Sequence, residues 1–159
     1  MPIAATRLDV RPESHHDRSA RRGLDSPGRD PQFITLQEAY RSRGGLVSGE
    51  SLARRMSTAG TGGYVDLARC IVSGHVFSFQ WQHDFWLPLF QFHPEDLVPL
   101  DAPRRVTRLL REVLDGWAMA RWYVTPAQAL DGRSPLALLD ADLPAVLAAA
   151  QAERQARRP

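Results

Sequence analysis

The residues of this 159-residue sequence that could do chemistry are few, and their spacing indicates no catalytic or metal site. The five histidines are His15, His16, His75, His83 and His93. They form no HExxH arrangement, so a metal site is not expected. Cys70 is the single cysteine, and its apolar neighbours predict a buried, inert thiol rather than a nucleophile.

The remaining polar motifs have simpler structural explanations. The glycine-rich stretch TAGTGG, residues 58–63, lacks the Lys-Ser/Thr that follows a phosphate-binding loop, so it predicts a turn between helices. Asp131, Asp140 and Asp142 stand where carboxylates cap helices or fill loops. We therefore predict that the chain is not an enzyme and needs no cofactor.

The composition of the sequence does not require any particular class of binding partner. The formal charge is +2 with a pI of about 9.2, which only leans toward nucleic acid. All 20 basic residues are arginine. One cysteine excludes a disulfide framework and agrees with a reducing compartment. Because no signal-peptide h-region or long apolar run is evident, we expect a cytoplasmic protein without a membrane span.

The elements that position these residues begin after an arginine-, serine- and proline-rich segment. Residues 1–31 hold too few aliphatic residues to offset the entropy of ordering, which predicts a disordered tail. Thr35 and Glu38 then have capping-box spacing, and Gly44 can end a short helix. Leu36, Ala39 and Tyr40 would point inward from that helix.

Residues 32–100 read as a small winged-helix-like unit. Ser48 would cap a helix with Leu52, Ala53 and Met56 on one face. A second helix follows, with Val65, Ala68 or Arg69, and Val72 at helical spacing, and ends at Gly74.

A β-hairpin completes this unit. Aromatic residues alternate with polar ones from Phe77 to Gln82, and a turn at His83–Asp84 leads into a second aromatic strand. The aromatic residues in question are Phe77, Phe79, Trp81, Phe85, Trp86, Phe90 and Phe92. They can form the core beneath the hairpin or stack nucleic-acid bases, and the core is the commoner use.

Residues 101–159 predict a helical bundle with tightly specified corners. Apolar residues from Val106 to Trp117 follow one helical face, and the opposite arginine-rich face is typical of a solvated surface. Thr125 and Pro126 would then begin a one-turn helix that closes at Gly132. Ser134 with Pro135, and then Asp142, would begin two more helices. The fold class is therefore mainly α, with the winged-helix-like unit followed by this bundle.

The segment from Trp117 through Ala150 resembles the toxin-binding domain of the Xre, MbcA and ParS antitoxins. That pattern is an aromatic-rich helix end, a Thr-Pro-Asn step, Leu-x-Gly, an arginine, Pro-Leu and a leucine pair before an alanine-rich helix. The matching positions are Thr125, Pro126, Leu130, Gly132, Arg133, Pro135, Leu136 and Leu139. Ala127 departs from the common asparagine, while LPLFQF at residues 87–92 is similar to a Pro-x-Phe-Gln-Phe element found upstream.

The resemblance implies an antitoxin of a type II toxin-antitoxin system. Its partner would be a RES-domain toxin that consumes NAD, neutralised when the C-terminal helical domain covers the mouth of the toxin's active-site cleft. The chain would act as a homodimer or as a hetero-oligomer with the toxin. We expect Trp122, Tyr123, Thr125 and Arg133 to contact the toxin, since Trp, Tyr and Arg dominate binding hot spots. Trp122 could equally fill the bundle core.

The family also commonly binds operator DNA and represses its own operon. In that case the helix from Tyr64 to Ser73 would enter the major groove, with phosphate contacts from Arg54, Arg55 and Arg69. Structural use of the winged-helix-like unit without DNA binding stays open. The alternative function is a stand-alone DNA-binding transcriptional regulator whose C-terminal bundle only dimerises.

Overall fold

The computed structural model describes residues 28–159, so residues 1–27 of the predicted 1–31 tail, which include His15 and His16, lie outside it. From Arg29 the predicted tail is helical instead. The first helix, α1, spans Arg29–Tyr40 and continues into a 3-10 turn, η1, Arg41–Arg43. It begins before Thr35, so the predicted capping box is wrong. Thr35 lies inside the helix and its hydroxyl donates to the Pro31 carbonyl at 2.9 Å. Gly44 ends the segment in the left-handed region, as predicted.

The short strand β1, Leu46–Ser48, leads into α2, Gly49–Thr58. The Ser48 hydroxyl accepts a hydrogen bond from the Ser51 N–H at 3.3 Å, which confirms the predicted cap. Leu52, Ala53 and Met56 are buried on the inner face. The expected helix-to-helix turn follows, and its Gly62 and Gly63 adopt positive φ angles that other residues reach only with strain.

The helix α3, Gly63–Val72, presents a different face to solvent than its apolar spacing suggests. Val65 and Val72 repeat at helical spacing, yet they are 67% and 77% exposed. Leu67 is instead the fully buried residue, with Cys70 and Ile71 partly buried beside it. The helix therefore carries apolar residues on both its inner and its outer face.

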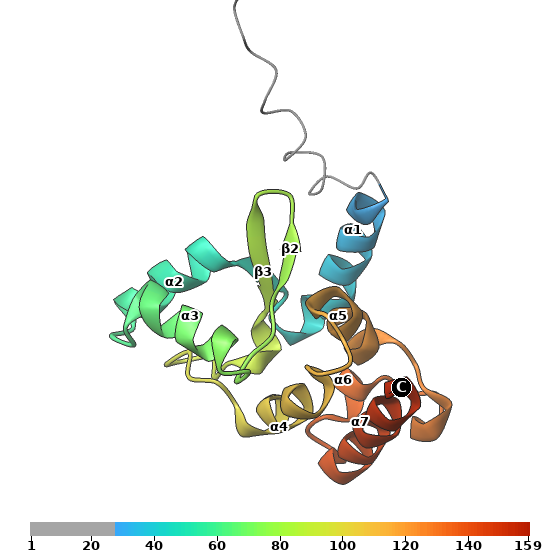
Figure 1. Ribbon diagram of the computed structural model, residues 1–159. Coiled ribbons are helices and arrows are strands. Elements are labelled where there is room, and N and C mark those ends of the chain that lie inside the picture. Colours follow the sequence, from blue (N-terminus) through green and yellow to red (C-terminus); the bar gives the residue numbers. More distant parts are fainter. Residues whose placement is uncertain (1–27) are drawn as a thin grey trace, which may run out of the picture.

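The hairpin consists of β2, Phe79–Trp81, and β3, Asp84–Pro88. Trp81 pairs with Asp84, so the turn is Gln82–His83, one residue earlier than predicted. Within residues 28–159 the strands form a three-stranded antiparallel sheet in the order β1-β3-β2. α2 and α3 lie beside this sheet, so the expected arrangement of two helices and a β-hairpin is present (Figure 1).

A buried glutamine explains the position of the LPLFQF segment, which includes the 3-10 turn η2, Leu89–Gln91. Gln91 is 1% exposed. Its side-chain oxygen accepts from the Phe77 N–H at 2.8 Å, and its amide N–H donates to the Phe77 carbonyl at 3.0 Å. A second N–H⋯O contact reaches the Pro88 carbonyl at 3.2 Å. One side chain thus joins the segment before β2 to the segment after β3.

The predicted helix from Asp101 through Trp117 is two helices. The first, α4, spans Asp101–Leu110, and the second, α5, spans Gly116–Val124. Asp115 caps α5 by accepting from the Ala118 N–H at 2.7 Å. At Gly116 a Cβ would stand only 1.9 Å from the Ser78 carbonyl oxygen, so this position requires glycine. Close contact with the hairpin therefore places the break.

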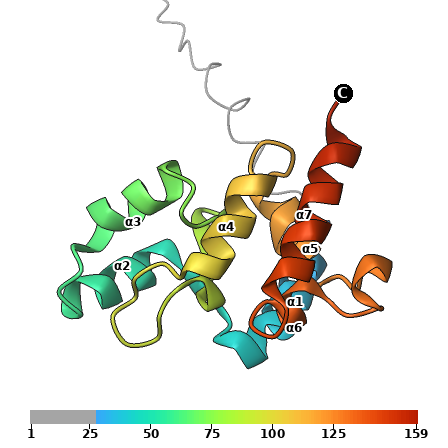
Figure 2. The same cartoon turned by 90° about the horizontal axis from the view of Figure 1, so that it is seen from below.

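Two short elements and one long helix complete the chain. They are η3, Gln128–Leu130, α6, Pro135–Leu138, and α7, Leu143–Arg157. The Ser134 hydroxyl accepts from the Ala137 N–H, and the Asp142 carboxylate accepts from the Ala145 N–H, which confirms both predicted caps. Figure 2 shows α7 lying along α4. The mainly α fold class is confirmed.

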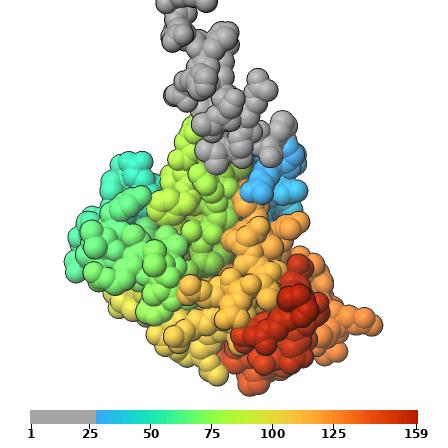
Figure 3. Space-filling model, viewed as in Figure 1, coloured from blue at the N-terminus to red at the C-terminus, as the bar shows by residue number. Residues whose placement is uncertain are grey.

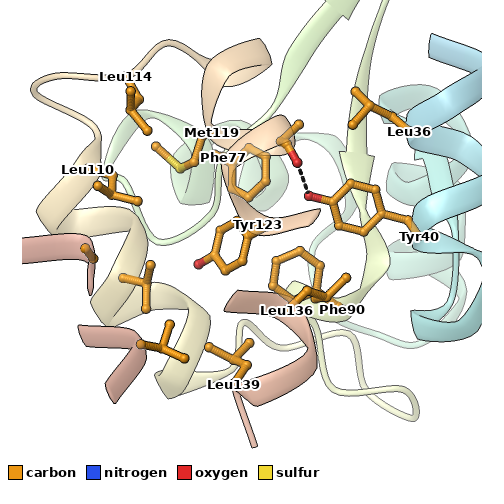
Figure 4. Packing of buried hydrophobic residues seen from close by; sticks show 14 of the residues in the cluster. Leu36, Tyr40, Phe77, Phe90, Leu110, Leu114, Met119, Tyr123, Leu136 and Leu139 are labelled. Atoms are coloured by element: carbon orange, nitrogen blue, oxygen red, sulfur yellow. Dashed lines mark hydrogen bonds between the residues drawn. The ribbon is translucent and has the colours of Figure 1, made fainter. Parts of the chain in front are cut away.

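Two hydrophobic clusters hold these elements together. The larger one joins α1 and the hairpin to the C-terminal helices, and Tyr40, Phe77, Phe90 and Tyr123 meet at its centre (Figure 4). The smaller one lies between α2, α3 and the sheet, around Leu52 and Leu67. The larger cluster spans the predicted boundary at residue 100, so the C-terminal helices share their core with α1.

The aromatic residues in and beside the hairpin are either buried in these clusters or packed against their edges. Phe77, Phe79, Phe90 and Phe92 are buried. Trp81, Phe85 and Trp86 are half-buried and pack against the clusters from their edge. Most of this aromatic set therefore serves as core.

Candidate binding surface of the C-terminal helices

The segment from Thr125 to Arg133 forms a closed loop between α5 and α6. Ala127 and Arg133 pair as an isolated antiparallel bridge, in which the Ala127 N–H donates to the Arg133 carbonyl at 3.1 Å. The Gly132 N–H also donates to the Ala127 carbonyl at 3.0 Å. Leu130 is 3% exposed and fixes the loop to the larger core. In Figures 2 and 3 this loop projects from the body of the molecule.

Left-handed backbone makes the tight return of this loop. Asp131 has a φ of 53° and Gly132 a φ of 76°. Glycine adopts this region freely, and aspartate is among the residues that tolerate it best. The loop backbone is therefore determined by local hydrogen bonds and turn chemistry, and its exposed side chains sit on a fixed frame.

Thr125 ends a helix rather than beginning one. Its hydroxyl donates to the Arg121 carbonyl at 2.7 Å, one turn back in α5. The residue that precedes η3 is Ala127, so the predicted N-cap at Thr125 is wrong. The threonine is exposed at the base of the loop, where its side chain remains accessible.

The two adjacent aromatic residues of α5 have different environments. Tyr123 is 0% exposed, stacks on Phe77 at 5.7 Å and donates a long hydrogen bond of 3.4 Å to the Pro103 carbonyl. Burial raises the pKa of the Tyr123 phenol above its ordinary value. Its side chain therefore belongs to the core and is unavailable for the predicted contact with a partner. Trp122 is half-buried, so part of its ring faces the surface.

Arg133 is the charged residue among the predicted toxin contacts. It is exposed and makes no ion pair within the described residues. Arg43 and Asp140, by contrast, form an ion pair of 2.7 Å that joins η1 to the turn after α6. Thr125, Arg133 and part of Trp122 therefore remain as accessible members of the predicted toxin-contact set.

The predicted DNA-contacting arginines lie on α2 and α3 but have different surroundings. Arg54 is within 3.6 Å of Glu50, and Arg69 is within 2.8 Å of Asp66. Arg55 has no such partner in the described part of the chain. It borders a cleft of about 580 Å³ whose lining includes Phe92.

The exposed face of α3 is mostly apolar. Val65, Ala68 and Val72 lie on it, with Tyr64 at its start. Arg69 is the basic residue on this helix. A helix that reads bases needs hydrogen-bonding side chains, and this face offers few of them. Sequence analysis missed this exposure because helical spacing alone does not tell which face is buried.

Metal-binding side chains do not converge in the part of the chain that the structure describes. No set of three His, Cys, Asp or Glu residues within 28–159 could hold a metal ion. Cys70 is partly buried, and burial raises the pKa of its thiol, which disfavours the reactive thiolate. Among the helices described, none combines the length and apolarity needed to cross a membrane.

The loop 125–133 and the end of α5 thus form an ordered part of the surface, supported by the buried aromatic core. Comparison of the chain with protein-family models, curated proteins and solved structures gives no significant match.

Proposed function

We propose that this protein is an antitoxin that neutralises a RES-domain, NAD-consuming toxin by binding it through the loop 125–133 and the end of α5. The proposal originates in the resemblance of Trp117–Ala150 to the Xre, MbcA and ParS toxin-binding domain. The observation that carries it furthest is the closed loop, whose backbone hydrogen bonds and buried Leu130 hold exposed side chains in place. The protein would act in the cytoplasm by binding, without catalysis or a cofactor.

The physical support is preorganisation. Binding by a flexible loop costs conformational entropy, and a loop that is already ordered avoids most of that cost. Arg133 adds an exposed guanidinium without an internal partner in the described residues, and Trp122 adds a partly exposed indole. Arginine and tryptophan are among the residue types enriched in binding hot spots.

Operator binding and autorepression are a second part of the proposal, assigned to Arg54, Arg55 and Arg69. The ion pairs of Arg54 and Arg69 lie on the surface, where such pairs contribute little, so a phosphate can replace the carboxylate. The apolar outer face of α3 argues for phosphate contacts over base reading. If so, DNA affinity should fall steeply with salt and depend weakly on sequence.

The test co-expresses the chain with the toxin encoded by the neighbouring reading frame and measures growth, NAD content and the affinity of the purified pair. Charge reversal by Arg133→Glu should weaken binding by about 10- to 100-fold, as expected for a hot-spot residue, and should restore toxicity. Arg105→Glu is the matched control, because Arg105 is also exposed but lies on α4. Trp122→Ala should weaken binding as well.

Point variants are preferable to truncation, because removal of the chain after Trp122 would also remove core residues such as Leu139, Val146 and Ala150. Circular dichroism and thermal melting should show that Arg133→Glu folds like the parent. Equal toxin affinity of the Arg133→Glu and Arg105→Glu variants would refute the loop as the contact surface. If cells that express the toxin grow equally well with and without this chain, the antitoxin function itself is refuted.

A further inference from the structure

A cavity of about 510 Å³ opens at the tip of the hairpin, far from the loop 125–133. It is bordered by the ends of β2 and β3 and by the first turns of α2 and α3. Cavities that hold small ligands usually measure about 300–1,000 Å³, so this one has the size of a binding site. Nothing in the toxin-binding proposal uses it.

Aromatic rings form much of the wall. Trp81 and Trp86 lie on the hairpin with ring centroids 5.9 Å apart and planes at 65°. Phe33 stacks on Trp81 at 3.8 Å with nearly parallel rings, which fixes that indole from behind. Tyr64 stands at the edge of the cavity, 58% exposed, with its ring 6.2 Å from Phe85. Packing against the larger core thus holds the two indole rings in place before any ligand arrives.

The acidic side chains that line the cavity are Glu50 and Asp84, and Glu50 is also within 3.6 Å of Arg54. Among the described residues no arginine borders the cavity, although the chain contains 20 of them. Glu50 lies in the first turn of α2, where a carboxylate also interacts well with the helix dipole. Asp84 accepts the N–H of its neighbour Phe85 at 2.8 Å and makes no ion pair within the described residues.

We propose that this cavity, lined by Tyr64, Trp81, Trp86, Glu50 and Asp84, binds a methylated ammonium group. Aromatic faces attract such cations through their quadrupole, and the methyl groups shed water more readily than a bare ammonium does. A nearby carboxylate adds a favourable Coulomb interaction that a neutral molecule of the same shape cannot obtain. The cation can belong to a small molecule of the choline kind or to a methylated lysine side chain.

The test titrates the full chain with choline and, separately, with a short peptide that carries trimethyllysine. The signals followed are the indole N–H resonances in ¹H–¹⁵N spectra, with 3,3-dimethylbutan-1-ol as the neutral isostere of choline. Saturable shifts with a cation, and none with the isostere at equal concentration, are expected. Whichever of choline and the trimethyllysine peptide binds more tightly identifies the source of the cation.

Three variants sharpen the result. Asp84→Asn keeps the oxygen that accepts the Phe85 N–H, and Tyr64→Leu removes an exposed ring without opening the core. Each substitution should weaken binding of the cation by about two- to five-fold or more, the range of an exposed cation–π contact. Asp66→Asn is the matched control, since this α3 carboxylate does not line the cavity. Equal responses to choline and its isostere, or unchanged affinity in Asp84→Asn, would overturn the proposal.

Discussion

The Tyr40 hydroxyl donates a 2.7 Å hydrogen bond to the Ala120 carbonyl oxygen, across 80 residues of sequence (Figure 4). Both groups are fully buried, and the bond joins α1 to α5, the helix that ends at the candidate binding loop. The first helix of the chain thereby helps to position the last ones. The loop 125–133 consequently depends on residues far from it in sequence.

Tyr40→Phe should destabilise the protein by about 1–2 kcal/mol, the usual value of one buried hydrogen bond with a desolvated partner. The ring and its stacking on Phe90 at 5.7 Å remain, so packing is conserved. Urea denaturation followed by circular dichroism measures the change. Tyr123→Phe is the control and should cost less, because its hydrogen bond to the Pro103 carbonyl is 3.4 Å long. A larger loss in Tyr123→Phe would contradict this ranking.

Stability should fall at alkaline pH. Burial raises the pKa of Tyr40, with a further contribution from Tyr123, and burial also raises the pKa of Tyr123. Because the folded state holds these protons more tightly, their contribution is complete below the unfolded pKa of about 10 and is lost as pH rises above it. The free energy of unfolding at pH 8 and at pH 11 checks the sign. The decline should be smaller in Tyr40→Phe, and an identical decline would contradict the assignment.

Gln91→Leu should destabilise the protein by about 2–4 kcal/mol, because it leaves the buried N–H and carbonyl of Phe77 without partners. The leucine fills a similar volume, so the loss reports hydrogen bonding. Gln80→Leu in β2 is the control, since the Gln80 side chain is exposed, and it should change stability by less than about 0.5 kcal/mol. Thermal unfolding of both variants makes the comparison.

Three of the predicted helix caps are confirmed. Ser48, Ser134 and Asp142 cap helices as expected, because each contact joins a side chain to a backbone N–H three residues ahead. Thr35 shows the limit of this approach, since its capping-box spacing occurs inside a helix that Phe33 and Leu36 extend by packing on the core. Tertiary burial there outweighs the local signal.

Features set by contacts distant in sequence were not predictable in the same way. The break between α4 and α5 depends on the approach of Gly116 to Ser78, and the burial of Tyr123 depends on α1 and the hairpin. The candidate loop was located correctly because its Pro, Gly and Leu pattern is local. Which of its residues are accessible required the three-dimensional structure.

Gly116→Ala should destabilise the protein by about 3 kcal/mol or more, because the new Cβ would meet the Ser78 carbonyl oxygen at 1.9 Å and neither backbone can move freely. Gly28→Ala is the matched control. Gly28 has open space around its Cβ position and a φ of −81°, so its change should stay within about 0.5 kcal/mol. Chemical denaturation of the two variants measures the difference in their free energies of unfolding. Equal stability would mean that the contact between Gly116 and Ser78 does not cause the break between α4 and α5.

The orientation of α3 gives the last prediction. Leu67 is 0% exposed and Val72 is 77% exposed, although both are large aliphatic residues on one helix. Leu67→Ala should cost about 2–5 kcal/mol through lost burial and a cavity. Val72→Ala should be neutral or slightly stabilising, because it removes no buried surface and alanine favours helix. Thermal melts of both variants measure the difference, and a Val72→Ala loss as large as that of Leu67→Ala would mean that the outer face of α3 is covered by another molecule in solution.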